Sequence, residues 1–249
     1  MVPYKDTAGS PFIELQLVDS TNNYATALIH EGMAQHGTCV FAHEQNKGKG
    51  QRNKQWITQK SANIILSVVI EPQPLGIQNF FAFSMAMALG AYHFFDKYAN
   101  DKVSIKWPND ILWDARKAGG ILIENTLQGQ QWKYAVVGVG ININQTYFGN
   151  LETKAVSLKQ ITGKEYDVLE MAKELSAYLL SSYDDFKRAP STVIEQYHQH
   201  LYKLNEEATF KKDSRVFNAT VKGVTSEGQL KVEHGLEELF EVGSVEWLL

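Results

Sequence analysis

Hydrophobic and polar residues repeat with the period of β-strands in several separate stretches of the chain. The alternation from Phe12 to Val18 is typical of a strand. Thr38–His43 predicts a second strand, and the apolar run Asn63–Ile70 predicts a buried one that is closed by prolines. Further short strands are expected at 103–107, 120–126 and 133–139.

Helical periodicity appears between these strands. Polar N-cap residues precede a helix that we expect near 22–35, and residues 79–99 form a long apolar helix rich in Ala, Met and Phe. Another helix is predicted to begin at Asp167, with Glu170 three residues later as its capping-box partner. A last helix is expected near 191–203.

The pattern changes after about residue 205. Short strands such as Val216–Thr225 and Gln229–Glu233, joined by a Ser-Glu-Gly turn, indicate a small β-barrel or sheet. The sequence therefore predicts an α+β fold with two domains. Residues 1–205 would form a mixed β-sheet with covering helices, and residues 206–249 a small C-terminal β domain.

Composition places the chain among globular proteins. Its 249 residues are 44% hydrophobic and 21% charged, and 24 Lys and Arg against 28 Asp and Glu give a net charge of -4. This mild acidity favours neither DNA nor a membrane surface as a partner. We find no signal peptide at the N-terminus and no membrane span, so we expect a cytoplasmic location.

The average charge conceals two unlike regions. Residues 45–60 contain five basic residues and no acidic one. Residues 206–249 contain nine acidic and five basic residues, an excess of four negative charges. A local site for anions is therefore compatible with the acidic total.

Cysteine and histidine offer no catalytic or metal site. Cys39 is the only cysteine and lies in an apolar stretch, which favours a core position over a nucleophile. His198 and His200 lie two apart in a predicted helix and would point in different directions, so a metal pair is not expected. His43, beside Glu44, is interpreted as a polar strand end rather than a general base.

The segment Gln45–Trp56 is the most unusual in the chain. Gly48 and Gly50 allow successive backbone N–H groups to turn toward an anion, and the surrounding lysines and arginine add positive charge. These features suit phosphate recognition by a mobile loop that orders on its ligand. A solvated basic loop is the alternative, and the spacing is not that of a Walker A motif.

Two further segments place lysines beside turns and glycines. The Lys-Trp-Pro-Asn-Asp segment presents Lys106, Asn109 and Asp110 close together at a sharp turn, although an ordinary Pro-Asn-Asp turn explains the same letters. Lys117 precedes two glycines and an apolar strand. Glycines there often mark the close approach of a ligand, and a lysine can reach its phosphate or carboxylate.

The last such segment, Gly138–Asn144, combines two glycines and two asparagines in an apolar run. Ile143 stands where a Rossmann fingerprint needs its third glycine, so a NAD site is rejected. We interpret the segment as a tightly packed strand that delivers Asn142 and Asn144 to one face.

Taken together and in order, five segments resemble the motifs of biotin–protein ligases, enzymes that attach biotin to a carboxylase carrier protein. The segments are D-S-T-N at 19–22, G-K-G-Q-R at 48–52, K-W-P-N-D at 106–110, Lys117 with G-G-I-L at 119–122, and G-x-G-x-N-x-N at 138–144. The resemblance implies a catalytic domain like that of class II synthetases. It implies no winged DNA-binding domain, because only about eighteen residues precede the first motif. Lys49 and Gln51 stand where the family often has arginine.

The resemblance also implies a two-step reaction and roles for particular residues. Biotin's carboxylate attacks the α-phosphorus of ATP to give biotinyl-5′-adenylate, and a lysine of the carrier protein then displaces AMP. Lys117 would face the biotin carboxylate and the α-phosphate, with Lys106 as second cation. Arg52 and Lys49 would close over the phosphates. Asp110 would hold Mg2+ or orient a lysine. The residues implied to bind biotin and ATP are Ser20, Thr21, Asn22, Gln45, Gly48, Lys49, Gly50, Gln51, Arg52, Trp56, Lys106, Asn109, Asp110, Lys117, Gly119, Gly120 and Asn142.

Expected ligands and partners follow from the same resemblance. ATP, Mg2+ and biotin would enter the site, and the protein partner would be a biotin carboxyl carrier protein of acetyl-CoA carboxylase or a similar carboxylase. The chain would act as a monomer or homodimer. A lipoate–protein ligase is the nearest rival, although such enzymes resemble this chain less in the K-W-P-N-D and G-x-G-x-N-x-N segments. A non-catalytic biotin or nucleotide sensor is a second rival, against which both lysines count.

Overall fold

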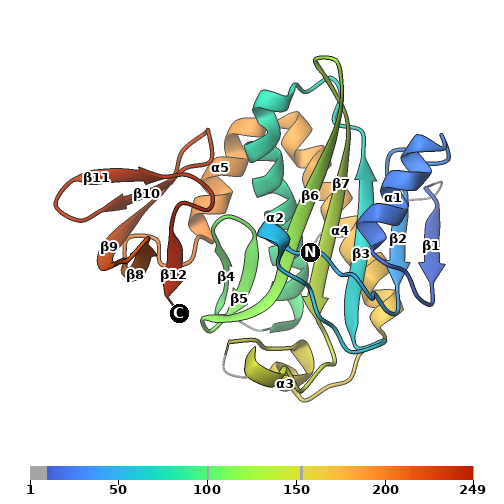
Figure 1. Cartoon of the computed structure of the whole chain (residues 1–249), viewed down its shortest axis with the longest axis horizontal. Helices are drawn as coiled ribbons and strands as arrows, with labels where there is room; N and C mark the ends of the chain where they lie inside the picture. The colour runs from blue at the N-terminus through green and yellow to red at the C-terminus, as the bar shows by residue number, and fades with distance from the viewer. Residues whose placement is uncertain (1–9, 100, 152–153, 249) are drawn as a thin grey trace.

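The computed structural model describes residues 10–99, 101–151 and 154–248, and it contains two sheets joined by helices (Figure 1). The extreme N-terminus, where the sequence predicts no signal peptide, lies outside the described residues. A seven-stranded mixed sheet has the order β1-β2-β3-β7-β6-β5-β4, and a five-stranded antiparallel sheet has the order β11-β10-β9-β8-β12. The predicted α+β fold is thereby confirmed.

The larger sheet is antiparallel except at one edge, where β1 runs parallel to β2. Its strands in chain order are β1 Phe12–Leu15, β2 Cys39–Ala42, β3 Asn63–Ile70, β4 Val103–Lys106, β5 Asp110–Trp113, β6 Arg116–Gln128 and β7 Gln131–Asn142. The predicted strand at 63–70 is confirmed to the residue. The strands expected at 120–126 and 133–139 are longer than predicted, because they continue as a hairpin whose turn contains Gly129 at φ +59°.

Helices cover both faces of this sheet (Figure 1). They are α1 Thr21–His30, α2 Phe80–Ala99, α3 Leu158–Thr162, α4 Val168–Arg188 and α5 Pro190–Gln199, with short 3-10 turns at Gln51–Asn53, Ile77–Asn79 and Gly149–Leu151. Alternate strand residues such as Val40, Val69 and Val136 pack against α1. Their neighbours Phe41 and Val68 belong to the larger core that includes α2 and α4. The buried strands thus have an apolar layer on each side.

The helix ends show where local sequence signals are insufficient. The helix expected near 22–35 ends at His30, because the chain then turns at Gly32 with φ +69°. Asp167 caps α4 as predicted, but the side chain of Glu170 pairs with Lys173. The capping box appears instead at the start of α3, where no helix was predicted.

The five-stranded sheet packs directly against the rest of the molecule (Figure 1). Its strands are β8 Glu207–Lys212, β9 Arg215–Val224, β10 Leu230–Glu233, β11 Glu237–Phe240 and β12 Glu246–Leu248. The indole N–H of Trp107 donates to the carbonyl of Gly228 at 3.0 Å, and the ring of His198 accepts the N–H of Val224 at 2.9 Å. The apolar side chains of this sheet join the main core. The division into domains at 205/206 stays a prediction.

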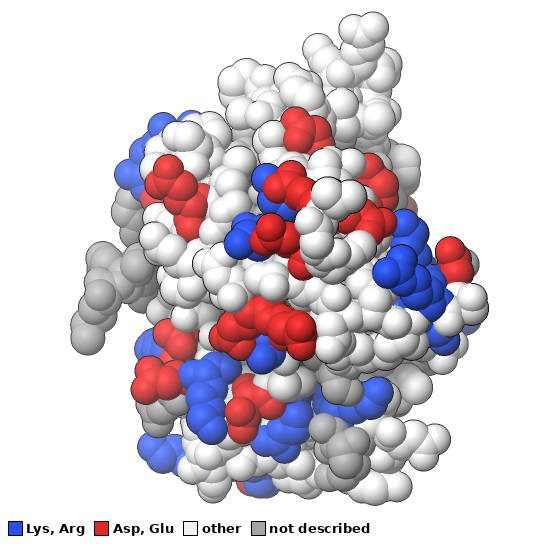
Figure 2. All heavy atoms as spheres, turned by 90° about the vertical axis from the view of Figure 1, so that its left-hand side faces the viewer, with Lys and Arg blue, Asp and Glu red and all other residues white. Residues whose placement is uncertain are grey.

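Ion pairs link acidic and basic side chains within residues 206–249 and leave the net excess of four negative charges unchanged. Figure 2 shows acidic and basic side chains intermingled on the side of the molecule where this sheet lies. Lysines 212, 222 and 231 pair with glutamates 238, 233 and 237 at 3.0, 3.5 and 3.3 Å. No described helix is long and apolar enough to cross a membrane.

Cysteine and histidine occupy structural positions. Cys39 is buried, and burial raises the pKa of its thiol to about 12. His198 contacts the backbone of β9, whereas the ring of His200 stacks on Tyr92 with centroids 4.0 Å apart. His43 lies 2.7 Å from a carboxylate oxygen of Glu14 on the neighbouring strand.

Candidate active site

One row of cross-strand neighbours traverses five strands of the larger sheet. Lys106 on β4 lies opposite Asp110 on β5, followed by Gly120 on β6, Gly140 on β7 and Ile65 on β3. Because side chains alternate along a strand, the row shares the face that α1 covers. The two glycines leave the middle of this row without side chains. Charged groups therefore stand at one end of a row whose middle leaves space for side chains from other segments.

A cavity of about 720 Å3 lies above this row, which forms its floor, and is within the size range of small-molecule sites. The segments singled out in the sequence converge on it. Its walls include Ser20, Thr21, Asn22, Gln45, Lys49, Gly50, Gln51, Arg52, Trp56, Lys106, Asn109, Asp110, Lys117, Gly120 and Asn142. The remaining two residues of the expected site, Gly48 and Gly119, lie just behind the wall. A side chain at Gly48 would meet the carbonyl of Trp56, and one at Gly119 would meet Ile141.

Two lysines share one carboxylate at the charged end of the floor. The Nζ atoms of Lys106 and Lys117 lie 2.9 and 2.7 Å from the two oxygens of Asp110. Burial alone would raise the pKa of this carboxyl, but the two ammonium groups outweigh burial and hold the pKa below its ordinary value of 3.8. The trio carries one net positive charge. Each ammonium group has further N–H bonds with which to bind an anion.

The D-S-T-N turn is fastened to the sheet by Asn22. Its Oδ1 accepts a hydrogen bond from Ser67 on β3 at 2.6 Å, and its Nδ2 donates to Glu124 at 2.7 Å and to the carbonyl of Leu122 at 3.4 Å, both on β6. The amide lies over Gly138, where a Cβ would be 2.9 Å from its carbon atom. Asn22 thus joins the start of α1 to three strands. Its polar atoms are used by the protein itself.

The neighbouring residues of the turn leave more polar groups for a ligand. The N–H of Thr21 donates to the side-chain oxygen of Gln45 at 2.9 Å, which holds the turn against the start of the basic loop. Ser20 is 2% exposed and stands at the N-terminus of α1, yet its hydroxyl does not cap that helix. Among the wall residues of this turn, Ser20 is therefore the one whose hydroxyl is best placed to bind a ligand.

The basic loop forms a small hairpin over the cavity. The N–H of Trp56 donates to the carbonyl of Gly48 at 3.0 Å, and the N–H of Gly50 donates to that of Lys54 at 2.7 Å. The indole of Trp56 lies over Gly140, where a Cβ would be 2.5 Å from its nitrogen, and the Nζ of Lys117 lies 5.5 Å from the ring centre. The glycines of the G-x-G-x-N-x-N segment thus make room for Asn22 and Trp56.

The two cations of this loop that the sequence assigns to phosphate have different neighbours. Lys49 pairs with Glu124 at 3.0 Å. The guanidinium of Arg52 lies against Gly243, in the turn before β12. Arg52 itself has φ +53°, a left-handed conformation at a non-glycine residue. The basic loop therefore contacts both the central sheet and the C-terminal sheet.

Asn142 and Asn144 do not act together as predicted. Asn142 ends β7 and donates to the carbonyls of Lys117 and Val156 at 3.3 and 3.1 Å. The strand stops there, and Asn144 instead exchanges hydrogen bonds with the backbone of Tyr166. The prediction that both side chains share one strand face is wrong, because period two holds only within a strand.

Sequence reasoning missed several parts of the wall. Glu246 and Trp247 lie on β12 and Val245 directly before it, whereas Phe148 and Leu151 come from the segment after β7. The indole nitrogens of Trp56 and Trp247 are buried and have no hydrogen-bond partner among the described residues. Nothing in the local sequence of β12 signals a role in a cavity. Its position there depends on how the two sheets pack.

The model of the biotin/lipoate A/B protein ligase family matches residues 14–142. This stretch is more than half of the chain and contains the trio of Asp110 and two lysines as well as the basic loop. The chain belongs to this family.

Curated relatives of this ligase family member support the assignment over different lengths. A bifunctional ligase/repressor BirA of Bacillus subtilis is 24% identical over 241 residues, which cover 94% of the chain and 74% of the relative. A biotin–[acetyl-CoA-carboxylase] ligase of Paracoccus denitrificans is 32% identical over 131 residues, 52% of the chain and 53% of the relative.

A solved structure supports the fold over nearly the full length of the chain. The biotin protein ligase of Aquifex aeolicus in complex with biotin and ATP superposes with a TM-score of 0.79 at 22% identity. The match covers 96% of this chain and 98% of the other. The arrangement of both sheets is therefore that of a biotin protein ligase fold.

Proposed function

We propose that this chain is an ATP-dependent biotin–protein ligase, which activates biotin as biotinyl-5′-adenylate and transfers the biotinyl group to a lysine of a biotin carboxyl carrier protein. The observation that carries the proposal is the cavity in which two lysines on one carboxylate face a basic loop across a glycine floor. The Paracoccus relative bears this activity in its name, and the Aquifex structure holds both biotin and ATP.

The first half-reaction brings two anions together, the carboxylate of biotin and the triphosphate of ATP. Positively charged side chains therefore have to lie beside the α-phosphate, where negative charge develops in the transition state. Lys117 is the principal candidate, because its ammonium is held 2.7 Å from Asp110 and its side chain is 38% exposed in the cavity. Lys106 supplies a second cation, and Arg52 a third on the loop. As biotin's carboxylate attacks, these groups offset the charge on the α-phosphate and the departing pyrophosphate.

The second half-reaction requires the adenylate to survive until an amine arrives. A mixed anhydride hydrolyses in water, so the basic loop, which carries Trp56 and Arg52, has to exclude solvent from the acyl carbon. The neutral amine of the acceptor lysine then attacks that carbon and AMP leaves. No covalent intermediate with the enzyme is needed, in keeping with the buried, structural position of Cys39.

Mg2+ accompanies ATP in many enzymes, but the side chains of this cavity do not fit a direct site for it. Both oxygens of Asp110 are engaged by lysines, and the described residues contain no cluster of three metal-binding side chains. We therefore assign Asp110 the second of its two predicted roles, the orientation of Lys106 and Lys117. No step of the mechanism is routed through the metal.

The decisive experiment separates biotin from lipoate. The purified protein is incubated with ATP and each acid in turn, and the adenylate formed is weighed by mass spectrometry. We expect biotinyl-adenylate with biotin and little product with lipoate. The reverse result would identify a lipoate ligase.

A second experiment separates an enzyme from a sensor. The protein that holds biotinyl-adenylate is mixed with a biotin carboxyl carrier domain, and the mass of that domain is followed over time. We expect one biotinyl group on one lysine. Adenylate formation without transfer would favour a sensor. A cytoplasmic location and a monomeric or dimeric state stay predictions, which fractionation and light scattering would test.

A further inference from the structure

Glu124 is a carboxylate on β6 that neither the sequence motifs nor the mechanism above uses. It lies opposite Val136, on the strand face that α1 covers. One oxygen accepts a hydrogen bond from Asn22 at 2.7 Å, and the other pairs with Lys49 at 3.0 Å. Glu124 therefore contacts, through two separate atoms, the turn assigned to biotin and the loop assigned to phosphate.

The side-chain amide of Asn22, which donates to Glu124, is fixed by further hydrogen bonds. The amide also receives the hydroxyl of Ser67 and reaches the carbonyl of Leu122, so it has little freedom to rotate. A hydrogen bond to a charged acceptor is stronger than one between neutral groups. Glu124 consequently has one well-fixed oxygen, and its second oxygen is presented to the loop in a defined place.

The Lys49 side is loosely held while the cavity is open to water. The side chains of Lys49 and Glu124 are 40% and 39% exposed. Ion pairs as exposed as this contribute little to stability, because water and salt screen them. The same pair becomes stronger when a ligand displaces water from it, because the effective dielectric constant falls. The loop is thus held weakly without ligand and strongly with one.

We propose that Glu124 is a positioning residue that couples the biotin-binding turn to the basic loop, so that occupancy of one half of the cavity favours ligand binding in the other. This inference rests on the proposed function, because it takes biotin and ATP as the two ligands. Biotin against the turn displaces water from the ion pair beside it, and the strengthened pair keeps Lys49 and its hairpin in place to receive the nucleotide. Two sites linked in this way affect each other reciprocally.

The test measures the affinity of a non-hydrolysable ATP analogue by titration calorimetry, without biotin and with saturating biotin. The unmodified protein is expected to bind the analogue about 5- to 20-fold more tightly when biotin is present, within the range of typical coupling between sites. Glu124→Gln retains an acceptor for Asn22 but loses the charge that holds Lys49. We expect this variant to reduce the enhancement to about twofold or less.

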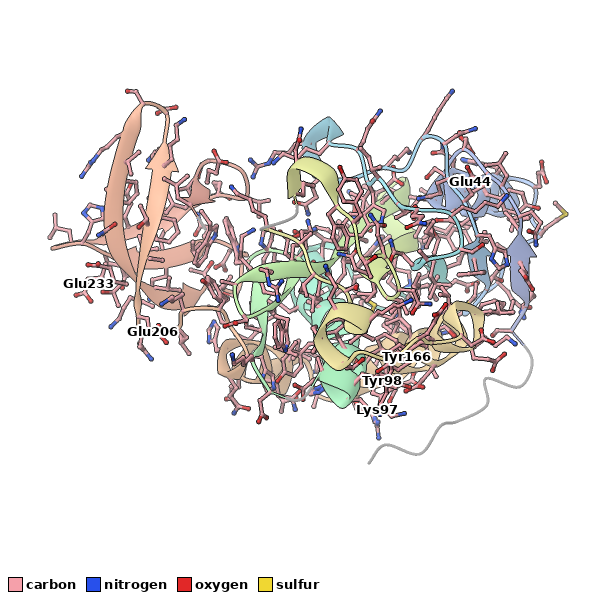
Figure 3. All side chains as sticks on the ribbon, turned by 90° about the horizontal axis from the view of Figure 1, so that it is seen from below. Glu44, Lys97, Tyr98, Tyr166, Glu206 and Glu233 are labelled. Carbon is pink, nitrogen blue, oxygen red and sulfur yellow. The ribbon has the colours of Figure 1, made fainter. Side chains whose placement is uncertain are left out.

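A matched control carries the same change elsewhere. Glu174 on α4 also accepts two hydrogen bonds, from Lys97 at 2.7 Å and from the hydroxyl of Tyr98 at 2.6 Å. Lys97 and Tyr98 lie together at the end of α2, beside Tyr166 (Figure 3), and none of these residues lines the cavity. Glu174→Gln should keep the full enhancement.

Lys49→Met removes the other partner of the same ion pair and leaves the hydrogen bonds of Asn22 intact. It should lose the enhancement as Glu124→Gln does, and the double variant should lose no more than either single one. Full enhancement in both single variants would overturn the proposal, and so would an equal loss in Glu174→Gln. Absence of biotinyl-adenylate with the unmodified protein would instead refute the proposed function, so the two failures are distinguishable.

Discussion

Replacement of Gly138 by alanine tests whether the glycines of β7 exist to make room for side chains from elsewhere. The added Cβ would lie 2.9 Å from the amide carbon and 3.0 Å from the amide nitrogen of Asn22, whereas ordinary contacts begin near 3.4 Å. The Asn22 amide cannot simply rotate away. Its hydrogen bonds to Ser67 and Glu124, at 2.6 and 2.7 Å, would lengthen or break.

The magnitude follows from those bonds. A neutral hydrogen bond contributes about 1 kcal/mol to stability and one to a charged group about 1.5–3 kcal/mol, while overpacking a core site typically costs about 1–3 kcal/mol. We therefore expect Gly138→Ala to lower the free energy of unfolding by about 2–3 kcal/mol. For a chain of this size that is a decrease in Tm of about 4–12 °C. Biotin affinity should fall as well, because the displaced turn lines the cavity.

A double-mutant cycle checks the cause. Urea unfolding is measured for the unmodified protein, Gly138→Ala, Asn22→Ala and the double variant. Without the Asn22 amide the methyl group has space, so Gly138→Ala should then cost less than about 1 kcal/mol. Gly120→Ala is a control on the next strand, because its Cβ would meet the flexible end of Lys117 at 3.3 Å. An equal cost of Gly138→Ala in both Asn22 backgrounds would show that contact with the Asn22 amide is not the cause.

Three further expectations concern the charged floor and the core. Lys117→Ala should slow pyrophosphate release about 10²- to 10³-fold with little change in Tm, as for the loss of other transition-state contacts. Because the lysines lower the pKa of Asp110, its contribution to stability is complete above 3.8 and is lost as pH falls through the lowered value. Urea titrations at a series of acidic pH values should therefore show Asp110→Asn losing less stability on acidification than the unmodified protein. Cys39, whose thiol pKa is raised to about 12, should resist alkylation near neutral pH until urea unfolds the chain, which thiol labelling rates would show.

Local sequence was sufficient for most of the elements, α3 excepted, and for the motif segments that line the cavity. The strand at 63–70 was predicted to the residue because its apolar run and its prolines mark both ends. Lys106, Asp110 and Lys117 stand out in the sequence because they lie beside a turn or a glycine pair and match family motifs. The sheet places both lysine Nζ atoms within 3 Å of the oxygens of Asp110.

Other features depend on packing that no short segment reveals. Glu124 has no distinctive neighbours in sequence, and its importance appears only when β6 pairs with β7 and α1 crosses the strand face. Trp247 reaches the cavity only because the second sheet packs against the first. Glu170 satisfies the spacing of a capping box, but a lysine three residues later is a better partner for its charge.

The contact between Arg52 and Gly243 has a consequence for the order of synthesis on the ribosome. About 190 residues separate Arg52 from Gly243. The cavity therefore stays open on one side until the turn before β12 has left the ribosome and folded. A nascent chain that ends before Ser244 already carries all five motifs and the whole larger sheet, yet it lacks Val245, Glu246 and Trp247 from the wall. Such a chain has the reactive lysines and Asp110 but lacks one wall of the cavity. An acyl-adenylate formed in it would be exposed to water. Late arrival of this wall thus delays enclosed chemistry until the C-terminal sheet is complete.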